Sequence, residues 1–333
     1  MTIRIGINGF GRIGRSMFRA ALHDPLFADL EIVAINDPAA PEILAHLLKY
    51  DSVMGPLPRP LELAGSVMRV GGRATQFHAL ADPGEIPWHR HGVDFVVESS
   101  GRFASLEMAG RHLQGGARRV VITAPAKGEV KTMVMGINED EYDPARDRVV
   151  SNASCTTNCL APVARVILDR FGLRRGLIST VHAYTNDQRL LDSPHNDLRR
   201  ARAAATSIIP TTTGAAAAIG LVIPELAGRF DGISVRVPTA NVSLMDVVME
   251  VERDCSTDEV NQALQEAQSR YLGFTMEPLV SSDFRDDVRS SIVDGLSTRV
   301  IASTVKVMSW YNNEWGYAHR LLDLILHMQS QEI

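Results

Sequence analysis

The chain has 333 residues, which suits two domains better than one hydrophobic core. Hydrophobic residues make up 45% of it and charged residues 22%, as in ordinary soluble globular proteins. The formal net charge of −5, with no basic cluster longer than residues 199–202, argues against nucleic acid as a partner. The sequence shows neither a signal peptide nor an apolar run long enough to span a membrane. We therefore expect a cytoplasmic protein with no membrane contact.

Cysteine usage indicates the same compartment. The three cysteines, Cys155, Cys159 and Cys255, are too few for a disulfide framework and indicate a reducing environment. Cys155 and Cys159 are four residues apart, but no further cysteine or histidine stands beside them at the spacing of metal ligands. We expect no metal site.

The N-terminal segment carries the pattern of a nucleotide-binding unit. Apolar residues alternate over 3–7, as in a strand, and a glycine-rich turn follows at 9–14. Residues 15–22 have the periodicity of a helix, and a second strand over 31–36 ends at Asp37. Strand, glycine turn, helix, strand and acid form the context that a dinucleotide-binding G-x-G-x-x-G motif requires.

Each residue of this motif has a physical task. Gly9 permits the tight turn, Gly11 lets the backbone approach a pyrophosphate, and Gly14 lets the helix pack closely on the strand. Asp37 would accept hydrogen bonds from the adenosine ribose hydroxyls, and its charge would repel the 2′-phosphate of NADP. The motif therefore predicts NAD as the cofactor, with NADP less favoured.

Further strand and helix patterns extend this sheet. Strands are predicted over 93–98 and 119–125, with a helix over 105–113 between them. Residues 99–101 are small and polar and suit a second cofactor contact. The stretch 55–87 is rich in proline and glycine and is expected to be an irregular or antiparallel insertion. This alternation implies a Rossmann-type α/β domain with a mostly parallel sheet and helices on both faces.

Cys155 stands where an extended polar stretch, 149–152, gives way to an amphipathic helix whose apolar residues recur from Leu160 to Phe171. Free N–H groups and the helix dipole favour negative charge at a helix N-terminus, so we expect a lowered pKa of Cys155 and a favoured thiolate. Cys155 is thus a candidate nucleophile; the alternative is a small buried apolar cysteine. Cys159, one turn further on, is expected to pack rather than react.

A candidate base follows on the next strand. Residues 176–181 are predicted to form a strand that delivers His182. A nucleophilic cysteine needs a base to hold the thiolate and to move the substrate's proton. The alternative is a histidine at a strand end whose nitrogens are satisfied by hydrogen bonds. Residues 184–210 have little periodicity and carry several arginines, and a long ordered loop of this sort is usually functional.

Oxyanion-binding residues are expected in the second half. Residues 210–214 open an alanine-rich helix, where hydroxyls and free N–H groups suit a phosphate; N-capping by threonine is the alternative. Arg236 lies in a β-rich run, and a helix over 259–272 and a strand over 305–310 complete an α+β domain. A last helix over 317–328 could return to the first domain.

These elements predict two domains. A nucleotide-binding domain takes residues 1–153 together with a C-terminal helix over 316–333. A catalytic α+β domain with a mixed or antiparallel sheet takes residues 154–315. The chain passes from one domain to the other just before Cys155.

Taken together, these segments resemble the phosphorylating, type I glyceraldehyde-3-phosphate dehydrogenases, essentially end to end. The matching stretches are INGFGRIGR, LAHLLKYDSV, SNASCTTNCLAP, HAYTNDQ, DLRRARAA, SIIPTTTGAA, RVPTANVS and WYNNEWGY. So many long matches in the right order make chance agreement negligible. The resemblance implies a homotetrameric, NAD-dependent oxidoreductase of glycolysis or gluconeogenesis that converts glyceraldehyde 3-phosphate and inorganic phosphate to 1,3-bisphosphoglycerate.

The resemblance also implies roles for single residues. Cys155 would attack the aldehyde to give a hemithioacetal and then a thioester, with His182 taking the hydroxyl proton. Asn313 matches the residue that hydrogen-bonds the nicotinamide carboxamide. The residues that match other cofactor contacts are Gly9, Arg12, Ile13, Asp37, Ser100 and Thr123.

Two anion sites are implied in the same way. Thr185 and Arg236 would hold the substrate's own phosphate. The attacking phosphate would be held by Ser154, Thr156, Arg200, Thr213 and Gly214. The loop that follows the histidine would pack between subunits and shape the cofactor pocket.

Some positions depart from the family pattern. Pro38 follows Asp37 where NAD-using members mostly have leucine, and Ala81 replaces an arginine near the adenine end. Asn312 replaces an aspartate just before the nicotinamide-binding asparagine. The retained Asp37 and Pro194 favour NAD over NADP, and so does the lost charge at position 81, because a 2′-phosphate needs a cation.

Three other functions compete with this one. Erythrose-4-phosphate dehydrogenases share Cys155 and His182 but use water in place of phosphate; residues 183–187 and 211–214 favour the phosphorylating enzyme. Arsenate, a tetrahedral oxyanion like phosphate, could take its place in arsenic resistance. A non-catalytic, RNA-associated protein is disfavoured by the net charge of −5 and by the intact catalytic pair. The sequence leaves the direction of metabolic flux open.

Overall fold

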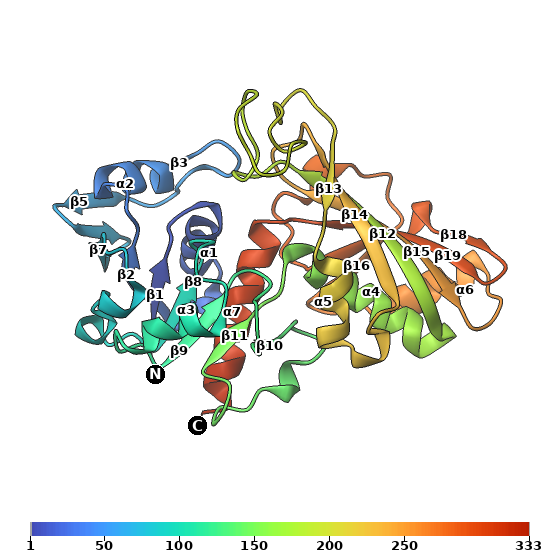
Figure 1. The fold of residues 1–333 in the computed structure, drawn as a ribbon, viewed down its shortest axis with the longest axis horizontal. Helices are drawn as coiled ribbons and strands as arrows, with labels where there is room; N and C mark the ends of the chain where they lie inside the picture. The colour runs from blue at the N-terminus through green and yellow to red at the C-terminus, as the bar shows by residue number, and fades with distance from the viewer. Residues whose placement is uncertain (1, 333) are drawn as a thin grey trace. The chain divides into compact units, whose positions relative to one another are not determined.

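The computed structural model describes residues 2–332, which divide into two compact units (Figure 1). The first unit takes the chain up to Met133, then Glu139–Ala153, and then the residues from Ala318 onward. The second unit takes Val134–Asn138 and Ser154–Tyr317. Among the described residues, no helix has both the length and the apolar character needed to cross a membrane.

The first unit is built on a mostly parallel sheet, as the sequence predicts. The central strand β1 (Ile3–Asn8) runs parallel to both its neighbours, β2 (Leu30–Asn36) and β8 (Phe95–Glu98). Parallel pairing continues beyond β8 through β9 (Arg119–Ile122), β11 (Val149–Ser151) and β10 (Lys131–Thr132).

The stretch 55–87 is only partly the insertion that we expect. Its last strand, β7 (Arg73–His78), pairs parallel with β2 and so belongs to the main sheet. Antiparallel pairing then leads outward from β7 to β6 (Val67–Val70) and β5 (Leu61–Ala64). Two short strands, β3 (Tyr50–Asp51) and β4 (Gly55–Pro56), form a separate pair.

Burial explains why the middle of this sheet is apolar. Ile5, Ile7, Val96 and Val97 are all 0% exposed, as expected for parallel strands that are covered on both faces. The helices of the unit are α1 (Arg12–His23), α2 (Pro41–Lys49), α3 (Leu106–Gly110) and the part of α7 (Trp315–Ser330) that follows Tyr317.

Two glycines shape the turn between β1 and α1. Gly9 has a φ of +92°, and a Cβ on it would lie 2.5 Å from the backbone of Ser100. A Cβ on Gly14 would lie 2.5 Å from the carbonyl oxygen of Gly9. Both positions therefore need glycine, one for the turn and one for helix–strand packing, which confirms the tasks predicted from the motif.

The second unit holds the mixed sheet that the sequence predicts. Its long strand β12 (Leu173–Ala183) pairs parallel with β14 (Phe230–Val237) and antiparallel with β15 (Ser243–Val251). The other strands are β13 (Ile209–Thr212), β16 (Leu272–Thr275), β17 (Ser291–Asp294), β18 (Arg299–Ile301) and β19 (Thr304–Tyr311). The helices are α4 (Cys155–Phe171), α5 (Ala215–Val222) and α6 (Thr257–Glu266).

The helix predicted over 259–272 is wrong at its C-terminal end. α6 ends at Glu266, and Ser269 Oγ accepts hydrogen bonds from the N–H groups of Tyr271 and Leu272 in the turn that follows. Leu272 then opens β16, which pairs parallel with β17. The turn is made by a serine hydroxyl within a still partly apolar sequence, so apolar spacing alone does not reveal it.

The start of α6 supplies a stability prediction. Ser256 Oγ accepts from the N–H of Glu259 over 3.2 Å, and Glu259 Oε2 accepts from the N–H of Ser256 over 2.8 Å, which is a reciprocal capping box. Ser256→Ala is expected to lower the free energy of unfolding by about 1 kcal/mol, measured by chemical denaturation. Ser256→Asp keeps an acceptor at the N-cap and should retain most of the stability. Equal losses in both variants would show that this hydrogen bond contributes nothing.

Candidate active site

Cys155 is the first residue of α4, which confirms its predicted place. The helix begins there because Ser154 is its N-cap: Ser154 Oγ accepts from the N–H of Thr157 over 3.0 Å. The N–H groups of Cys155 and Thr156, with the Thr156 hydroxyl, are placed to stabilise a thiolate. That hydroxyl also lies 3.0 Å from the OH of Tyr311 in a buried contact.

The register of β12 against β14 brings the partners of Cys155 together. His182 is paired with Arg236 across this parallel ladder. His182 Nε2 lies 3.7 Å from Cys155 Sγ, and Arg236 Nη1 lies 2.7 Å from His182 Nδ1. The same arginine nitrogen donates to the carbonyl oxygen of Ala183 over 3.1 Å. Cys155, His182 and Arg236 therefore form one group, which we call the nucleophile cluster.

Burial sets the charges of the nucleophile cluster. It raises the pKa of the Cys155 thiol above its ordinary value, although the charge of Arg236 and hydrogen bonds from Thr156 act in the opposite direction. Burial, together with the charge of Arg236, lowers the pKa of His182 to about 3. At neutral pH the pair is therefore a thiol beside a neutral imidazole. The lowered pKa that we predict for Cys155 is wrong, because desolvation outweighs the helix N-terminus.

The tautomer of His182 decides what its other nitrogen can do. His182 Nδ1 lies 2.7 Å from the carbonyl oxygen of Ala183 and 2.7 Å from Arg236 Nη1. A guanidinium only donates and a carbonyl oxygen only accepts. When Nδ1 carries the proton and donates it to Ala183, Nε2 presents a lone pair to the sulfur and can act as a base. When Nδ1 accepts from Arg236, Nε2 carries the proton.

A second polar cluster lies in the loop between β12 and β13. Arg200 Nε donates to Thr211 Oγ1 over 2.8 Å, and Arg200 Nη1 donates to Asp187. Thr211 Oγ1 in turn donates to Asp197 Oδ2 over 2.9 Å. These bonds hold the guanidinium of Arg200 in place. The pKa of Arg236 is lowered mainly by burial, and the charge of Arg200 lowers it further. Both aspartates lie in stretches that match the family, HAYTNDQ and DLRRARAA, but the sequence alone assigns neither of them to Arg200.

The remaining oxyanion residues make local contacts. The N–H of Thr185 donates to Gln188 Oε1 over 3.1 Å. Thr213 Oγ1 accepts from the N–H of Ala215 over 3.3 Å, but the N-cap of α5 is Gly214, so the alternative of N-capping by threonine is wrong. Gly214 is the N-cap residue of α5 and brings no side-chain cap, which leaves the first turn of that helix open to an anion.

Asn312 and Asn313 follow β19. Asn313 Oδ1 accepts from Ser243 Oγ over 3.0 Å. Asn312 Oδ1 accepts from two backbone N–H groups at the start of α7, as the aspartate of the family pattern could. Asn312 Nδ2 also donates to Asn241 Oδ1 over 2.9 Å, a bond that an aspartate could not make.

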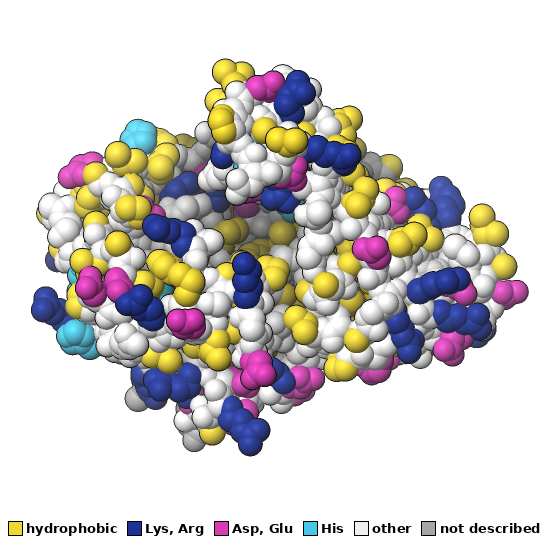
Figure 2. All heavy atoms as spheres, in the orientation of Figure 1, with side chains coloured by type: hydrophobic (Ala, Val, Ile, Leu, Met, Phe, Trp, Pro, Cys, Tyr) yellow, Lys and Arg dark blue, Asp and Glu magenta, His cyan; other side chains and the backbone are white. Residues whose placement is uncertain are grey.

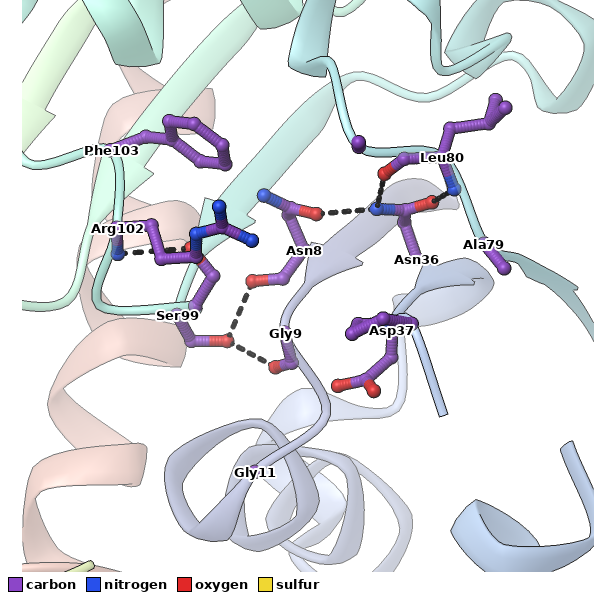
Figure 3. Close-up of a pocket in the computed structure, with 13 residues that line it drawn as sticks. Asn8, Gly9, Gly11, Asn36, Asp37, Ala79, Leu80, Ser99, Arg102 and Phe103 are labelled. Carbon is purple, nitrogen blue, oxygen red and sulfur yellow. Dashed lines mark hydrogen bonds between the residues drawn. The ribbon is translucent and has the colours of Figure 1, made fainter. Parts of the chain in front are cut away.

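A pocket of about 300 Å³ lies in the first unit, where β1 and β2 end (Figure 3). Four residues predicted to bind the cofactor line it: Gly9, Gly11, Asp37 and Ser100. Both departures near the adenosine end, Pro38 and Ala81, line it as well. The other lining residues are Asn8, Asn36, Ala79, Leu80, Ser99, Arg102 and Phe103.

The residues of this pocket fit a dinucleotide. Asp37 is held in one orientation, because its Oδ2 accepts from the N–H of Phe10 over 2.8 Å and its Oδ1 from the N–H of Ala39 over 2.9 Å. Gly11 is the N-cap of α1 and makes no side-chain cap, so N–H groups of the first turn can face a pyrophosphate. A ribose beside Asp37 and a pyrophosphate at α1 are the contacts that the motif predicts.

Five predicted cofactor residues lie outside the lining: Arg12, Ile13, Gly14, Thr123 and Asn313. Arg12 donates through Nη1 to Asp51, so its contribution at the start of α1 would come from its backbone. Ile13 stands next to it in the same first turn. Thr123 follows β9, and its Oγ1 donates to the carbonyl oxygen of Glu98 over 3.1 Å.

Sequence reasoning missed Asn8 and Asn36, which line the pocket, and Glu98 behind them. Each is the last residue of a parallel strand, of β1, β2 and β8 respectively. Ligands of open parallel sheets bind outside the carboxyl ends of the strands. Polar residues at those three positions were therefore a signal that the sequence already carried.

Two features together define a class of protein. One is a Rossmann-type sheet with a nucleotide pocket, and the other is a cysteine–histidine pair at a helix N-terminus of the same chain. The class is that of dinucleotide-dependent enzymes that work through a thiol. Within that class, the chain belongs to the glyceraldehyde-3-phosphate dehydrogenase family. Residues 3–106 match the NAD binding domain of that family, and residues 154–313 match its C-terminal domain.

Relatives that carry this name match the whole chain. It is 54% identical to glyceraldehyde-3-phosphate dehydrogenase of Geobacillus stearothermophilus, over 99% of both chains. It is 52% identical to glyceraldehyde-3-phosphate dehydrogenase 1 of Bacillus subtilis (strain 168), over 99% of both. It is 50% identical to glyceraldehyde-3-phosphate dehydrogenase of Streptomyces coelicolor, over 99% of this chain and 100% of the relative. The resemblance found in the sequence is confirmed.

The electrostatics of the nucleophile cluster can be tested at Arg236. Arg236→Leu is expected to raise the pKa values of Cys155 and His182, because a nearby positive charge stabilises a thiolate and opposes an imidazolium. The rate of Cys155 alkylation by iodoacetamide, followed against pH in a Cys255→Ser background, should shift to higher pH. Arg175→Leu removes an exposed arginine of β12 and should leave the profile unchanged. An unshifted profile in Arg236→Leu would show that the charge of Arg236 does not affect the pKa of the Cys155 thiol.

Proposed function

We propose that this chain catalyses the oxidative phosphorylation of glyceraldehyde 3-phosphate to 1,3-bisphosphoglycerate with NAD and inorganic phosphate. One observation carries the proposal. His182 Nε2 lies 3.7 Å from Cys155 Sγ at the N-terminus of α4, in a chain that belongs to the family named for this substrate. A thiol nucleophile beside a base is the arrangement that aldehyde oxidation through a thioester requires.

The steps follow from this pair. Cys155 Sγ adds to the aldehyde carbon while His182 Nε2 accepts the thiol proton and passes it to the developing alkoxide, which gives a hemithioacetal. His182 then takes the hydroxyl proton as a hydride leaves the same carbon, and a thioester remains. NAD, when bound, supplies the hydride acceptor. Inorganic phosphate attacks the thioester carbonyl, the acyl phosphate departs, and the sulfur regains its proton from His182.

We assign the substrate's own phosphate to Thr185 and Arg236. The residues assigned to the attacking phosphate are Ser154, Thr156, Arg200, Thr213 and Gly214. Two features support these assignments. Arg200 and Arg236 are close enough for one charge to act on the other, and guanidinium groups bind phosphate well. The uncapped first turn of α5 at Gly214 adds backbone donors.

We assign NAD to the first unit. Its proposed contacts are Gly9, Gly11, Arg12, Ile13, Gly14, Asp37, Ser100 and Thr123, with Asn313 of the second unit for the nicotinamide carboxamide. The fixed carboxylate of Asp37 and the open N-terminus of α1 support the adenosine and pyrophosphate contacts. Residues 1–153 with 316–333 would then serve as the NAD-binding domain, and residues 154–315 as the catalytic domain.

We infer further that the chain works as a homotetramer in the cytoplasm. The loop between β12 and β13 carries four large apolar side chains that are 71% to 83% exposed, Leu190, Leu191, Leu198 and Ile208. The space-filling view shows such side chains among charged ones on this loop (Figure 2). An exposed apolar group of this kind is typical of a surface that packs against another protein.

Initial rates with glyceraldehyde 3-phosphate test the reaction. We expect reduction of NAD that depends on inorganic phosphate, and much slower reduction of NADP, because Asp37 would face its 2′-phosphate. Full-rate oxidation of erythrose 4-phosphate without phosphate would assign the chain to the erythrose-4-phosphate dehydrogenases instead. Arsenate should substitute for phosphate as a tetrahedral oxyanion, and a strong preference for it would indicate a role in arsenic resistance.

Two substitutions test the catalytic pair. Cys155→Ser should abolish turnover, and His182→Asn should lower kcat by roughly 10²–10⁴-fold, the usual contribution of a general base. NAD should still bind to both variants in a fluorescence titration. Cys159→Ser alters a buried cysteine that contacts Ser291 and is the control that should keep most of the activity. A His182→Asn protein that no longer binds NAD would contradict the assigned role.

A further inference from the structure

A buried carboxylate behind the nucleotide pocket fixes the direction of a chain of hydrogen bonds that ends in the pocket wall. We propose that Glu98 is a positioning residue for NAD. Its carboxylate, which can only accept hydrogen bonds, orients two asparagine side chains, Asn8 and Asn36. These in turn hold residues 79–81 as one wall of the pocket. The inference rests on the proposed function, because it takes NAD as the ligand of this pocket.

Glu98 is the last residue of β8 and is 2% exposed. Its Oε1 accepts from the N–H of Ser100 over 2.9 Å and from the hydroxyl of the same residue. Its Oε2 accepts from Asn8 Nδ2 over 2.6 Å and lies 2.9 Å from His112 Nε2. The buried carboxylate is therefore surrounded by donors, which is the condition for keeping such a group inside a protein.

The tautomer of His112 follows from its other neighbour. His112 is 0% exposed, and Trp88 Nε1 donates to its Nδ1 over 3.1 Å. An indole N–H can only donate, so Nδ1 is the acceptor and the neutral ring carries its proton on Nε2. That N–H points at Glu98. His112 thus presents the carboxylate with a donor and not with a second acceptor.

The side chains of Asn8 and Asn36 connect Glu98 to the pocket wall, and each has a fixed donor and acceptor orientation (Figure 3). Because Asn8 Nδ2 donates to Glu98, its Oδ1 is turned to Asn36 and accepts from Asn36 Nδ2 over 2.8 Å. Asn36 Nδ2 also donates to the carbonyl oxygen of Leu80 over 2.9 Å. Asn36 Oδ1 accepts from the N–H of Leu80 over 2.8 Å. Reversing either amide would set donor against donor or acceptor against acceptor.

The wall needs the hydrogen bonds from Asn36 because residues 79–81 lie beyond the end of the last strand before them and are not part of the sheet. β7 ends at His78, and Ala79, Leu80 and Ala81 are exposed although all three line the pocket. The two bonds from Asn36 fix the middle residue of this segment through its backbone. Through Ser100, the same carboxylate also holds a lining residue that follows β8.

Glu98→Gln is the sharpest test, because the substitution keeps the shape of the side chain and replaces one acceptor with a donor. In one orientation its NH₂ faces the N–H of Ser100. In the other it faces Asn8 Nδ2 and His112 Nε2–H. The first orientation sets two donors against one another at the edge of the pocket, and the second does so among buried side chains, where the loss is costly because water cannot enter.

We expect Glu98→Gln to weaken NAD binding roughly tenfold in a fluorescence titration of the full-length protein. The KM for NAD should rise in proportion, while kcat at saturating NAD and the KM for glyceraldehyde 3-phosphate change little. Asp294→Asn is the matched control. Asp294 is a buried carboxylate of the second unit that accepts from Trp310 Nε1 and from the N–H of Ser297. Its replacement should leave NAD affinity unchanged.

A double-mutant cycle separates positioning from a general loss of stability. Glu98 reaches Asn36 through Asn8, so Glu98→Gln and Asn36→Ser should act on NAD affinity less than additively. Hydrogen exchange at the Leu80 amide should be faster in either variant, because its acceptor is displaced or removed. If Glu98→Gln fails to fold, Asn36→Ser tests the wall by NAD affinity and by exchange at Leu80.

The outcomes that overturn the proposals are distinct. Three outcomes would refute the positioning role and leave the enzyme assignment intact. The first is wild-type NAD affinity in Glu98→Gln, and the second is additive effects in the double-mutant cycle. The third is a folded Asn36→Ser protein that matches the wild type in both NAD affinity and exchange at Leu80. A wild-type protein that neither binds nor reduces NAD would refute the proposed function itself.

Discussion

The ladder between β12 and β14 is the constraint on which the nucleophile cluster depends. It pairs His182 with Arg236, and the cap at Ser154 starts α4 at the residue whose sulfur meets that histidine. A shift of one residue in a strand turns its side chains to the opposite face of the sheet. Two independent pieces of backbone geometry, a parallel ladder and a helix N-terminus, therefore have to agree before the sulfur of Cys155 and the ring of His182 meet.

Arg236 acts on the two halves of the pair in opposite senses. Its charge favours the thiolate of Cys155 and opposes the imidazolium of His182, and burial works against the charged form of both. The resting pair is therefore uncharged. An anion beside Arg236 would weaken its opposition to the imidazolium. The proposed binding of a phosphate and the proposed proton transfers are linked by the same guanidinium.

Local patterns in the sequence were enough to place Cys155 at a helix start and His182 at the end of a strand, because caps and periodicity are local. The sign of the pKa shift at Cys155 could not be predicted in this way, since desolvation depends on packing by distant residues. The support behind the pocket was missed for a similar reason: Asn8 and Glu98 are 90 positions apart and meet only through the ladder of β1 and β8. The end of α6 was missed because a single hydroxyl, that of Ser269, makes the turn.

The division of the chain into two units also determines which unit is completed first during synthesis. The first unit includes the residues from Ala318 onward, and Glu332 pairs there with Arg119, as His327 does with the carbonyl oxygen of Glu139. Domains generally fold as they leave the ribosome, N-terminal parts first. Here the second unit is complete once Tyr317 has emerged, whereas the first still lacks its last helix. The first unit, whose strands are synthesised earliest, is thus the last of the two to be completed.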